Sequence, residues 1–282
     1  MPIPDLYRNN VLKLRSVVSL LPELFPAPFD YLLKLDDDAF PDVPAILATL
    51  QEKPQNRYYA GLTFTARPVR DPEHKNYVSE ACFPDSAFEP FVYGPGVLLS
   101  WDVVEQLRSH LEGGGGGVMI RDGEGEDGIC CDVDDVQLSI WLRGLGVEPA
   151  HSDVFSGKRN CHRASQLVFD VSEELAAEIW AGRERGEGVC GSAVQKLLME
   201  KADEKGDVNE GVVRRIALGR FEEALGMLEG DGDGEGVLTA NRVALLEPLR
   251  ACVRANVGCD ALLDAIDKSL RHITRETQVP EW

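Results

Sequence analysis

The chain lacks several features that would place it in a common functional class at once. No window approaches the ~18 uninterrupted apolar residues that a membrane span requires, and residues 1–5 do not open a basic stretch followed by an apolar one. Basic residues are few, because 29 lysines and arginines stand against 48 acidic residues, for a net charge of −19. Without a local basic patch, this charge argues against electrostatic binding to nucleic acid or to anionic lipid.

Cysteine is present but sparse, and its spacing excludes further classes. The seven cysteines include the neighbours Cys130 and Cys131 but no CxxC pair, which argues against a structural zinc site. An odd number cannot all pair within one chain, and a small disulfide scaffold would be far denser in cysteine, so the compartment stays undecided. No acidic stretch has the twelve-residue spacing of an EF-hand, which argues against a calcium-binding protein.

The length and apolar content predict two compact units. The chain has 282 residues, of which 44% are hydrophobic, enough for each unit to bury a core. The pattern changes near residue 165. Residues 1–164 alternate strands with helices, as in an α/β domain, and residues 165–282 have helical periodicity, which predicts an all-α C-terminal region. A single tetratricopeptide-like stretch at 217–225 has no 34-residue repeat, so a plain helical appendage is favoured.

Apolar periodicity and turn residues set the expected elements of the first region. Val11, Leu14, Val17, Val18 and Leu21 lie at helical spacing in 10–24, and the apolar run 29–35 has the length of a strand buried in a mixed or parallel sheet. A capping-box spacing of Asp102 and Glu105 opens another helix. The further predictions are helices at 43–51, 102–111 and 136–145, strands at 57–64 and 91–99, a loop at 68–90, a low-complexity acidic insertion before residue 132, and C-terminal helices at 173–181, 190–204, 208–229, 238–257 and 259–273.

Three consecutive aspartates follow the strand predicted at 29–35. In extended chain, residues two apart point to the same side, so Asp36 and Asp38 converge while Asp37 faces away. Paired carboxylates favour magnesium or manganese, and a site with few protein ligands leaves positions for substrate phosphates. Ligands also gather at the carboxyl ends of strands in open α/β sheets. The alternative is a solvated acidic turn, which mutual repulsion makes the costlier interpretation.

Two further positions carry groups that perform chemistry in other proteins. Asp134 and Asp135 open the helix predicted near 136–145, where two adjacent carboxylates raise one pKa and produce a general base, or simply cap the helix. His151, beyond that helix, is either a metal ligand or an ordinary loop histidine.

A glycine-containing segment and an arginine pair are open to two interpretations each. The stretch Tyr93-Gly94-Pro95-Gly96 is either a close approach of backbone to a ligand or only a turn. Arg67 and Arg70 lie near a possible diphosphate site or in a surface turn.

Four blocks in this order resemble the β-1,3-galactosyltransferase type of family 31 glycosyltransferases, which includes β-1,3-N-acetylgalactosaminyltransferases. The blocks are YRNNVLKLRSVVSLLPE with YLLKLDDDAF, YYAGLTFTARPVRDPEHKNYVSEACFP, FVYGPGVLLSWDVVEQL, and DDVQLSIWLRGLGVEPAHSDVF. The resemblance covers the chain from about Asp5 to Cys161. It leads us to expect that the family's upstream βα region is missing from this sequence.

The resemblance implies a GT-A type nucleotide-sugar fold, a mixed sheet flanked by helices, and inverting transfer of a hexose from a UDP-sugar to a glycan hydroxyl. Asp36 and Asp38 would bind Mn²⁺ or Mg²⁺, with His151 completing the metal shell. Asp37 and the turn from Gly94 to Gly96 would contact the donor. Asp135 would be the base, supported by Asp134.

The same resemblance implies a place in the cell and a set of partners. Members of the family are Golgi membrane proteins that act in protein glycosylation on glycan or glycoprotein acceptors, held by an N-terminal anchor that this sequence does not contain. The competing hypothesis is an inactive transferase fragment that acts as an interaction protein through its helical C-terminal half.

Overall fold

The chain folds as two compact units. A computed structural model describes residues 3, 6–25, 27–113, 133–157, 161–162, 164–205 and 224. The first unit contains the described residues up to 39 together with those in 44–155, and the second contains 40–43 and the described residues from 156 onward. The chain thus leaves the first unit at residue 40 and returns to it at residue 44.

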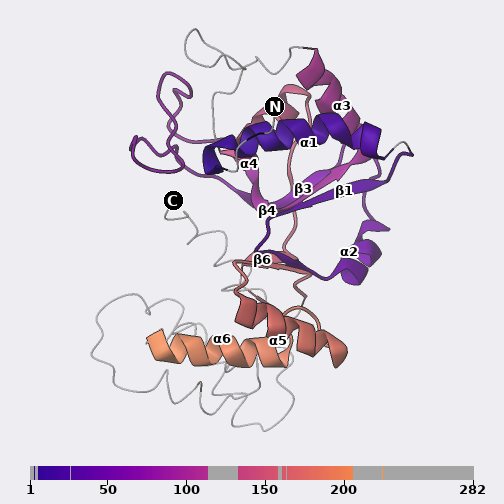
Figure 1. The fold of residues 1–282 in the computed structure, drawn as a ribbon, viewed down its shortest axis with the longest axis vertical. Coiled ribbons are helices and arrows are strands. Elements are labelled where there is room, and N and C mark those ends of the chain that lie inside the picture. Colours follow the sequence, from indigo (N-terminus) through magenta and orange to yellow (C-terminus); the bar gives the residue numbers. More distant parts are fainter. Residues whose placement is uncertain are drawn as a thin grey trace. The chain divides into compact units, whose positions relative to one another are not determined.

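The first unit is built on a four-stranded mixed sheet in the order β1-β4-β3-β5. Figure 1 labels β1, β3 and β4 of this sheet. β4 pairs antiparallel with both β1 and β3, whereas β3 pairs parallel with β5. The predicted α/β class and mixed sheet are therefore confirmed. The strands are β1 (Tyr31–Leu35), β3 (Tyr59–Phe64), β4 (Phe91–Ser100) and β5 (Ala150–His151).

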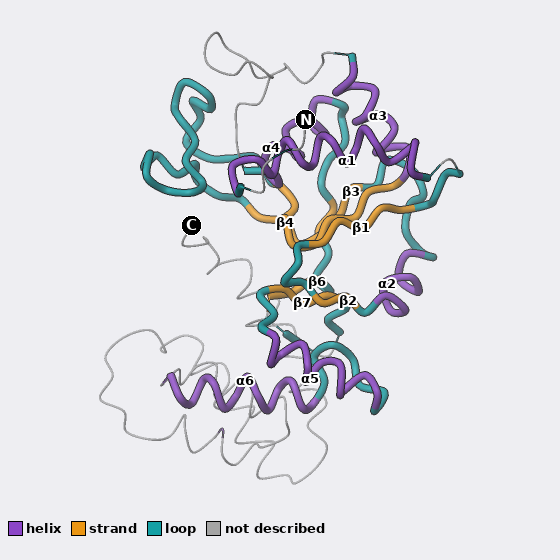
Figure 2. Tube along the Cα trace, viewed as in Figure 1, coloured by secondary structure: helices purple, strands orange, loops and turns teal. Residues whose placement is uncertain are grey.

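Three helices cover one face of this sheet (Figure 2). They are α1 (Asn10–Leu24), α3 (Trp101–Glu112) and α4 (Asp134–Gly144). Their buried aliphatic side chains share one core with Tyr59 of β3 and with Val97 and Leu99 of β4, whereas Leu98 is not part of it. This alternation is what a strand with one face on the helices requires. A short 3₁₀ helix η1 (Tyr7–Asn9) precedes α1, and α2 (Val43–Leu50) precedes β3.

The bounds of α1 to α4, β1, β3 and β4 agree with the sequence predictions to within two residues, whereas η1, β2 (Phe40–Pro41) and β5 were not predicted. Two details differ. All five residues of β1 are half-buried and β1 is an end strand of the described sheet, so the expectation of a strand buried on both sides is wrong. The capping box is wrong as well. Ser100 holds the N-cap position of α3, and the Asp102 carboxylate instead accepts hydrogen bonds from the Arg57 amide and the Ser100 hydroxyl.

The central strand β4 is interrupted by a bulge, defined here as the β4 bulge, residues 93–96. Gly61 pairs with Val97 and Thr63 pairs with Val92, so Leu62 alone stands opposite four residues of β4. Pro95 has no amide to donate to the sheet, which explains why regular pairing cannot continue through this segment. The Val92 amide donates to the Tyr59 hydroxyl at 3.1 Å. The bulge therefore turns backbone groups away from β3, toward other elements of the first unit.

The second unit contains a three-stranded sheet in the order β2-β7-β6 and two packed helices. The elements are β2 (Phe40–Pro41), β6 (Phe155–Gly157), β7 (Leu167–Phe169), α5 (Glu173–Glu184) and α6 (Ser192–Lys205). The Ser172 hydroxyl caps α5 by accepting the Leu175 amide. Because β7 lies beyond residue 165, the expectation that the C-terminal region is helical throughout is wrong. Apart from Ala224, the helices predicted at 208–229, 238–257 and 259–273 lie outside the described residues, as does the acidic insertion.

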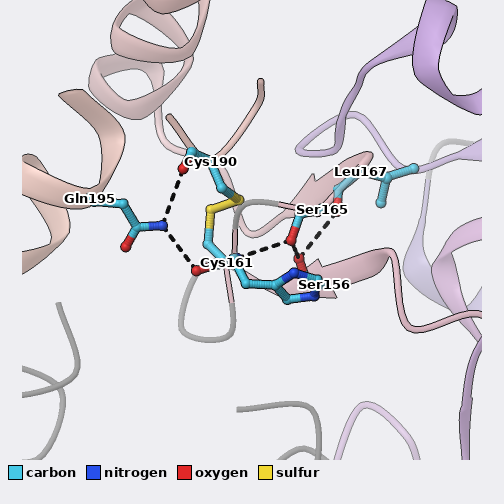
Figure 3. Close-up of a disulfide and its surroundings, with 7 residues drawn as sticks. Ser156, Cys161, Ser165, Leu167, Cys190 and Gln195 are labelled. Atoms are coloured by element: carbon cyan, nitrogen blue, oxygen red, sulfur yellow. Dashed lines mark hydrogen bonds between the residues drawn. A yellow bond between two sulfur atoms is a disulfide. The ribbon is translucent and has the colours of Figure 1, made fainter. Parts of the chain in front are cut away.

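A disulfide joins Cys161 to Cys190 in the core of the second unit (Figure 3). Both cysteines are almost fully buried. The Gln195 side-chain amide of α6 donates to the carbonyls of both cysteines, at 3.0 and 3.3 Å. The segment before β7 is thus tied covalently and by hydrogen bonds to the start of α6.

Among the helices that the structure describes, none has the length and apolar character needed to cross a membrane.

We predict that Gly61→Ala destabilises the first unit by about 2–4 kcal/mol. A methyl group at residue 61 would overlap the Val92 side chain and the Gly96 carbonyl, both of which belong to β4. Urea unfolding monitored by circular dichroism measures the change. The matched control is Gly144→Ala near the end of α4, where an added methyl meets nothing within 4 Å. Equal unfolding midpoints for the two variants would show that β4 moves aside at little cost.

Candidate active site

The aspartate triplet forms a turn at the end of β1. The strand ends at Leu35, and the Ala39 amide donates to the Asp36 carbonyl at 3.2 Å, which closes a turn through Asp37 and Asp38. The side-chain alternation of an extended strand therefore does not apply here, and the premise that placed Asp36 and Asp38 on one side of a strand is wrong. Asp37 and Asp38 are exposed, as at a surface that a ligand reaches.

Lys34 lies at the centre of the acidic groups. Its ammonium contacts Asp36 Oδ1 at 2.8 Å and Asp134 Oδ2 at 3.3 Å, and donates to the Gly94 carbonyl at 2.9 Å. Burial lowers the Lys34 pKa, but the attraction of Asp134 and Asp36 outweighs it and raises the pKa above the ordinary value. Lys34 is therefore a permanent cation that joins β1, the β4 bulge and the start of α4.

Asp135 is the buried carboxylate of the site, with only 5% of its surface exposed. Its Oδ2 accepts the Gly94 amide at 3.1 Å and its Oδ1 accepts the Val136 amide at 2.8 Å. Burial, followed by repulsion from Asp134, raises its pKa to about 7, although both amides and Lys34 act in the opposite direction. Near neutral pH this carboxyl is thus poised between its two protonation states, as a general base requires.

Neither aspartate at the start of α4 is a helix cap. Val133 holds the N-cap position and its side chain makes no capping hydrogen bond. Asp134 and Asp135 both lie in the first turn, where the helix dipole favours negative charge. Neither residue is therefore the N-cap, although the Asp135 carboxylate accepts one amide of the first turn, that of Val136.

Tyr59 borders Asp135 from β3. Its side chain is almost fully buried, its hydroxyl accepts the Val92 amide, and it also hydrogen-bonds the Ser139 side chain of α4. Burial raises its pKa to about 12, and the nearby Asp135 charge acts in the same direction. Tyr59 is thus a neutral group that links β3 to α4 beside Asp135.

Gly94 is where the β4 bulge meets the charged groups. Its amide donates a hydrogen bond to Asp135, and its carbonyl accepts one from Lys34. The neighbouring Pro95 carbonyl accepts a hydrogen bond from the Asp36 amide at 3.4 Å. Gly96 lies in the same bulge, paired with Leu35 of β1. The segment is therefore neither a free turn nor a terminal loop, since its backbone organises the acidic residues around it.

His151 of β5 contacts Thr63 of the neighbouring strand β3. Nδ1 of His151 accepts the Thr63 amide at 3.3 Å and lies 2.9 Å from the Thr63 hydroxyl. The roles in the contact with the hydroxyl depend on the tautomer: a ring protonated on Nδ1 donates to the Thr63 hydroxyl, and this is the tautomer that metal binding through Nε2 needs. In the ranges that the structure describes, no three His, Cys, Asp or Glu side chains are grouped so as to hold an ion.

Arg70 has a structural role in the loop before β4. Its guanidinium donates to the carbonyls of Val78, Phe83 and Asp85 at 2.6–3.1 Å. Of the two interpretations of the arginine pair, the surface turn therefore holds for Arg70. Arg67 is exposed.

Sequence reasoning missed Lys34 and Tyr59. The signal for Lys34 was available, because a lone lysine inside the apolar run YLLKL must find acceptors or reach water. Nothing comparable marked Tyr59, since a tyrosine in a strand is more often an ordinary core residue.

Comparison with known proteins shows which family this chain resembles. Residues 1–114 match the sequence model of the family described as Galactosyltransferase. The predicted family resemblance is thereby confirmed. Beta-1,3-galactosyltransferase 1 of Homo sapiens is 26% identical over 193 residues, which cover 62% of this chain and 52% of the human protein.

Two further relatives extend the comparison to a plant protein and to a second human protein. Beta-1,3-galactosyltransferase GALT1 of Arabidopsis thaliana is 27% identical over 158 residues, covering 54% of this chain and 22% of the plant protein. Beta-1,3-galactosyltransferase 9 of Homo sapiens is 24% identical over 177 residues, which cover 61% of this chain and 44% of the human protein. The chain spans about half the length, or less, of these galactosyltransferase relatives.

The similarity to these galactosyltransferases reaches α4. A continuous stretch of 54% or more of a 282-residue chain must include its centre wherever it begins, and Trp141 of α4 lies there. The matched family model ends before this helix, at residue 114. The relatives therefore extend the resemblance from the aspartate triplet to the helix that carries Asp135.

We predict that the stability of the protein falls as the pH rises from about 4 to about 7, through Asp135. In this interval the folded protein keeps a proton on Asp135 that the unfolded chain has lost, because the pKa of an unperturbed aspartate is 3.8 and that of Asp135 in the folded protein is about 7. The stabilisation is complete below pH 3.8 and is lost as the pH passes through about 7. The slope is at most about 1.4 kcal/mol per pH unit.

Urea unfolding at several pH values compares the wild type with Asp135→Asn, which cannot titrate. The free energy of unfolding of the wild type minus that of Asp135→Asn should fall steadily across the interval. Asp85→Asn, at an exposed position, serves as the control and should run parallel to the wild type. A parallel curve for Asp135→Asn would mean that Asp135 keeps an ordinary pKa.

Proposed function

We propose that this chain is a metal-dependent, inverting hexosyltransferase. It would move galactose or an N-acetylhexosamine from a UDP-sugar to a glycan hydroxyl with β-1,3 linkage, in protein glycosylation. The family match and the names of the relatives support the reaction type. The observation that carries the proposal is the buried Asp135 carboxyl, whose pKa of about 7 fits a base working near neutral pH.

Asp135 is the proposed base. It takes the proton of the acceptor hydroxyl while that oxygen forms a bond to the anomeric carbon of the donor sugar. The bond from this carbon to the UDP oxygen breaks, and its electron pair leaves with the diphosphate. The two backbone amides that donate hydrogen bonds to Asp135 hold its carboxylate in place. Each carboxylate oxygen keeps a further lone pair for the incoming proton.

The turn after β1 is the proposed donor end of the site. Asp36 and Asp38 supply carboxylate oxygens, the donors that Mn²⁺ and Mg²⁺ prefer, so their chemistry fits a divalent cation with open positions for a diphosphate. When bound, this cation would neutralise the charge that develops on UDP as it leaves. His151 is the proposed third ligand, and its Nδ1 is positioned by Thr63.

Other residues hold the reacting groups. Asp37, exposed at the turn, is proposed to contact hydroxyls of the donor. Gly94 and Gly96 shape the β4 bulge beside the donor, and Gly94 donates its amide to the base. Asp134 supports the base through its charge, since its repulsion raises the Asp135 pKa.

The fold and location belong to the same proposal. The mixed sheet with helices on one face is consistent with a GT-A type transferase core within residues 1–164. Residence in the Golgi is proposed from the family resemblance. The buried disulfide between Cys161 and Cys190 is consistent with that oxidising compartment.

We predict that the purified chain binds UDP in a manganese-dependent way and that Asp36→Ala/Asp38→Ala abolishes this binding. The variant removes the carboxylates that the cation needs, and isothermal titration calorimetry with and without manganese measures the loss. The matched control is Asp85→Ala/Glu89→Ala, which removes the same charge at exposed positions of the loop before β4. Equal binding by both double variants would place the donor site elsewhere. No binding by the wild type would favour the inactive interaction protein.

The Asp135→Asn variant completes this test. It should bind UDP as the wild type does but transfer sugar about 10²–10⁴ times more slowly, because only the proton acceptor is lost. Release of UDP in the presence of each UDP-hexose and a glycan acceptor gives the rate. Unchanged transfer by Asp135→Asn would remove Asp135 from the reaction.

A further inference from the structure

We propose that Lys34 is a positioning residue for the base. Its ammonium holds the β4 bulge and the first residue of α4 together, so that the Asp135 carboxyl keeps its place against Gly94. This inference rests on the proposed function, since it assigns Lys34 a role in the same site.

The contacts of Lys34 form a continuous path to Asp135. The ammonium donates to the Gly94 carbonyl at 2.9 Å, and the Gly94 amide donates to Asp135 Oδ2 at 3.1 Å. The same ammonium pairs with Asp134 at 3.3 Å, one residue before Asp135 in the chain. Both the partner of the base and the helix that carries the base are therefore fixed by one cation.

The charges around Asp135 give Lys34 a second effect. Among the described residues, the titratable groups that act on Asp135 are Asp134 from its own helix, Lys34 from β1 and Tyr59 from β3. Tyr59 is neutral near pH 7, so Lys34 is the positive charge that balances Asp134. Without it, a buried carboxyl would stand beside an unscreened carboxylate, and its ionised form would become costlier.

The pairing with Asp36 extends this balance to the donor end. Lys34 contacts Asp36 Oδ1 at 2.8 Å, so the ammonium is shared between the aspartate turn and the start of α4. The side chain reaches both because Lys34 is the next-to-last residue of β1, two residues before Asp36. A cation of this kind couples the position of the donor residues to that of the base.

Lys34→Met tests the proposal in the intact chain, because methionine keeps the apolar stem without the charge. The carboxyl signal of Asp135 is followed by ¹³C NMR in protein labelled on aspartate, and is assigned as the signal that Asp135→Asn lacks. We expect the Asp135 pKa to rise by about one pH unit in Lys34→Met. Lys34→Arg, which keeps the charge, should stay close to the wild type, and Lys53→Met in an exposed turn should not differ from it.

The same variants give a kinetic readout that a purely structural role would not move. In Lys34→Met the rise of kcat/KM with pH should shift to higher pH, with about a fivefold loss at pH 7. An unchanged Asp135 pKa and an unchanged pH profile in folded Lys34→Met would overturn the proposal. The NMR titration needs no transfer activity, so a shifted pKa in a chain that binds no UDP would count against the proposed function and not against the coupling.

A second comparison applies if Lys34→Met does not fold. In the Asp134→Asn background, removal of Lys34 leaves no unpaired carboxylate at residue 134. Asp134→Asn and Asp134→Asn/Lys34→Met then differ only in the ammonium. A higher Asp135 pKa in the double variant supports the proposal, and equal values overturn it.

Discussion

The arrangement of the first unit around its acidic residues depends on one ammonium group. A lysine inside an apolar strand is unfavourable unless its charge meets partners, and Lys34 meets two carboxylates and a carbonyl from three separate segments. Of those partners, the Asp134 side chain is the less exposed carboxylate and gains most from a cation nearby. The end of β1, the turn after it, the β4 bulge and the start of α4 therefore depend on one another. Only the strand end and its turn are neighbours in the sequence.

The second constraint is the irregularity of β4. A regular central strand would use all of its backbone groups to pair with its neighbours, and Pro95 prevents this. The resulting bulge frees the Gly94 amide and carbonyl to bond Asp135 and Lys34. Gly61 is the counterpart on β3, because only a residue without a side chain lets the Gly96 carbonyl pass so close. The geometry of the base thus arises from a break in the sheet and not from its regular part.

Sequence alone predicted the elements of the first unit closely, because their apolar spacing and turn residues are strong local signals. It also named Asp36, Asp134 and Asp135 as candidates for chemistry. It could not predict the turn that replaces an extended DDD segment, since a hydrogen bond from Ala39 decides it. Nor could it predict that Lys34 joins these residues, because that contact depends on strands and a helix about sixty and a hundred residues apart. The three-residue strand β7 was missed because so short a segment carries no usable periodicity.

The second unit is discontinuous in the sequence, and this has a consequence for the order in which the protein is made. β2 comes from residues 40–41, yet its partner β7 is synthesised only at 167–169, and the disulfide that ties the start of α6 waits for Cys190. On the ribosome, the segment directly after the aspartate turn therefore emerges long before anything can pair with it. The apolar side chain of Phe40 therefore waits for its partner strand while residues 44–155 are translated.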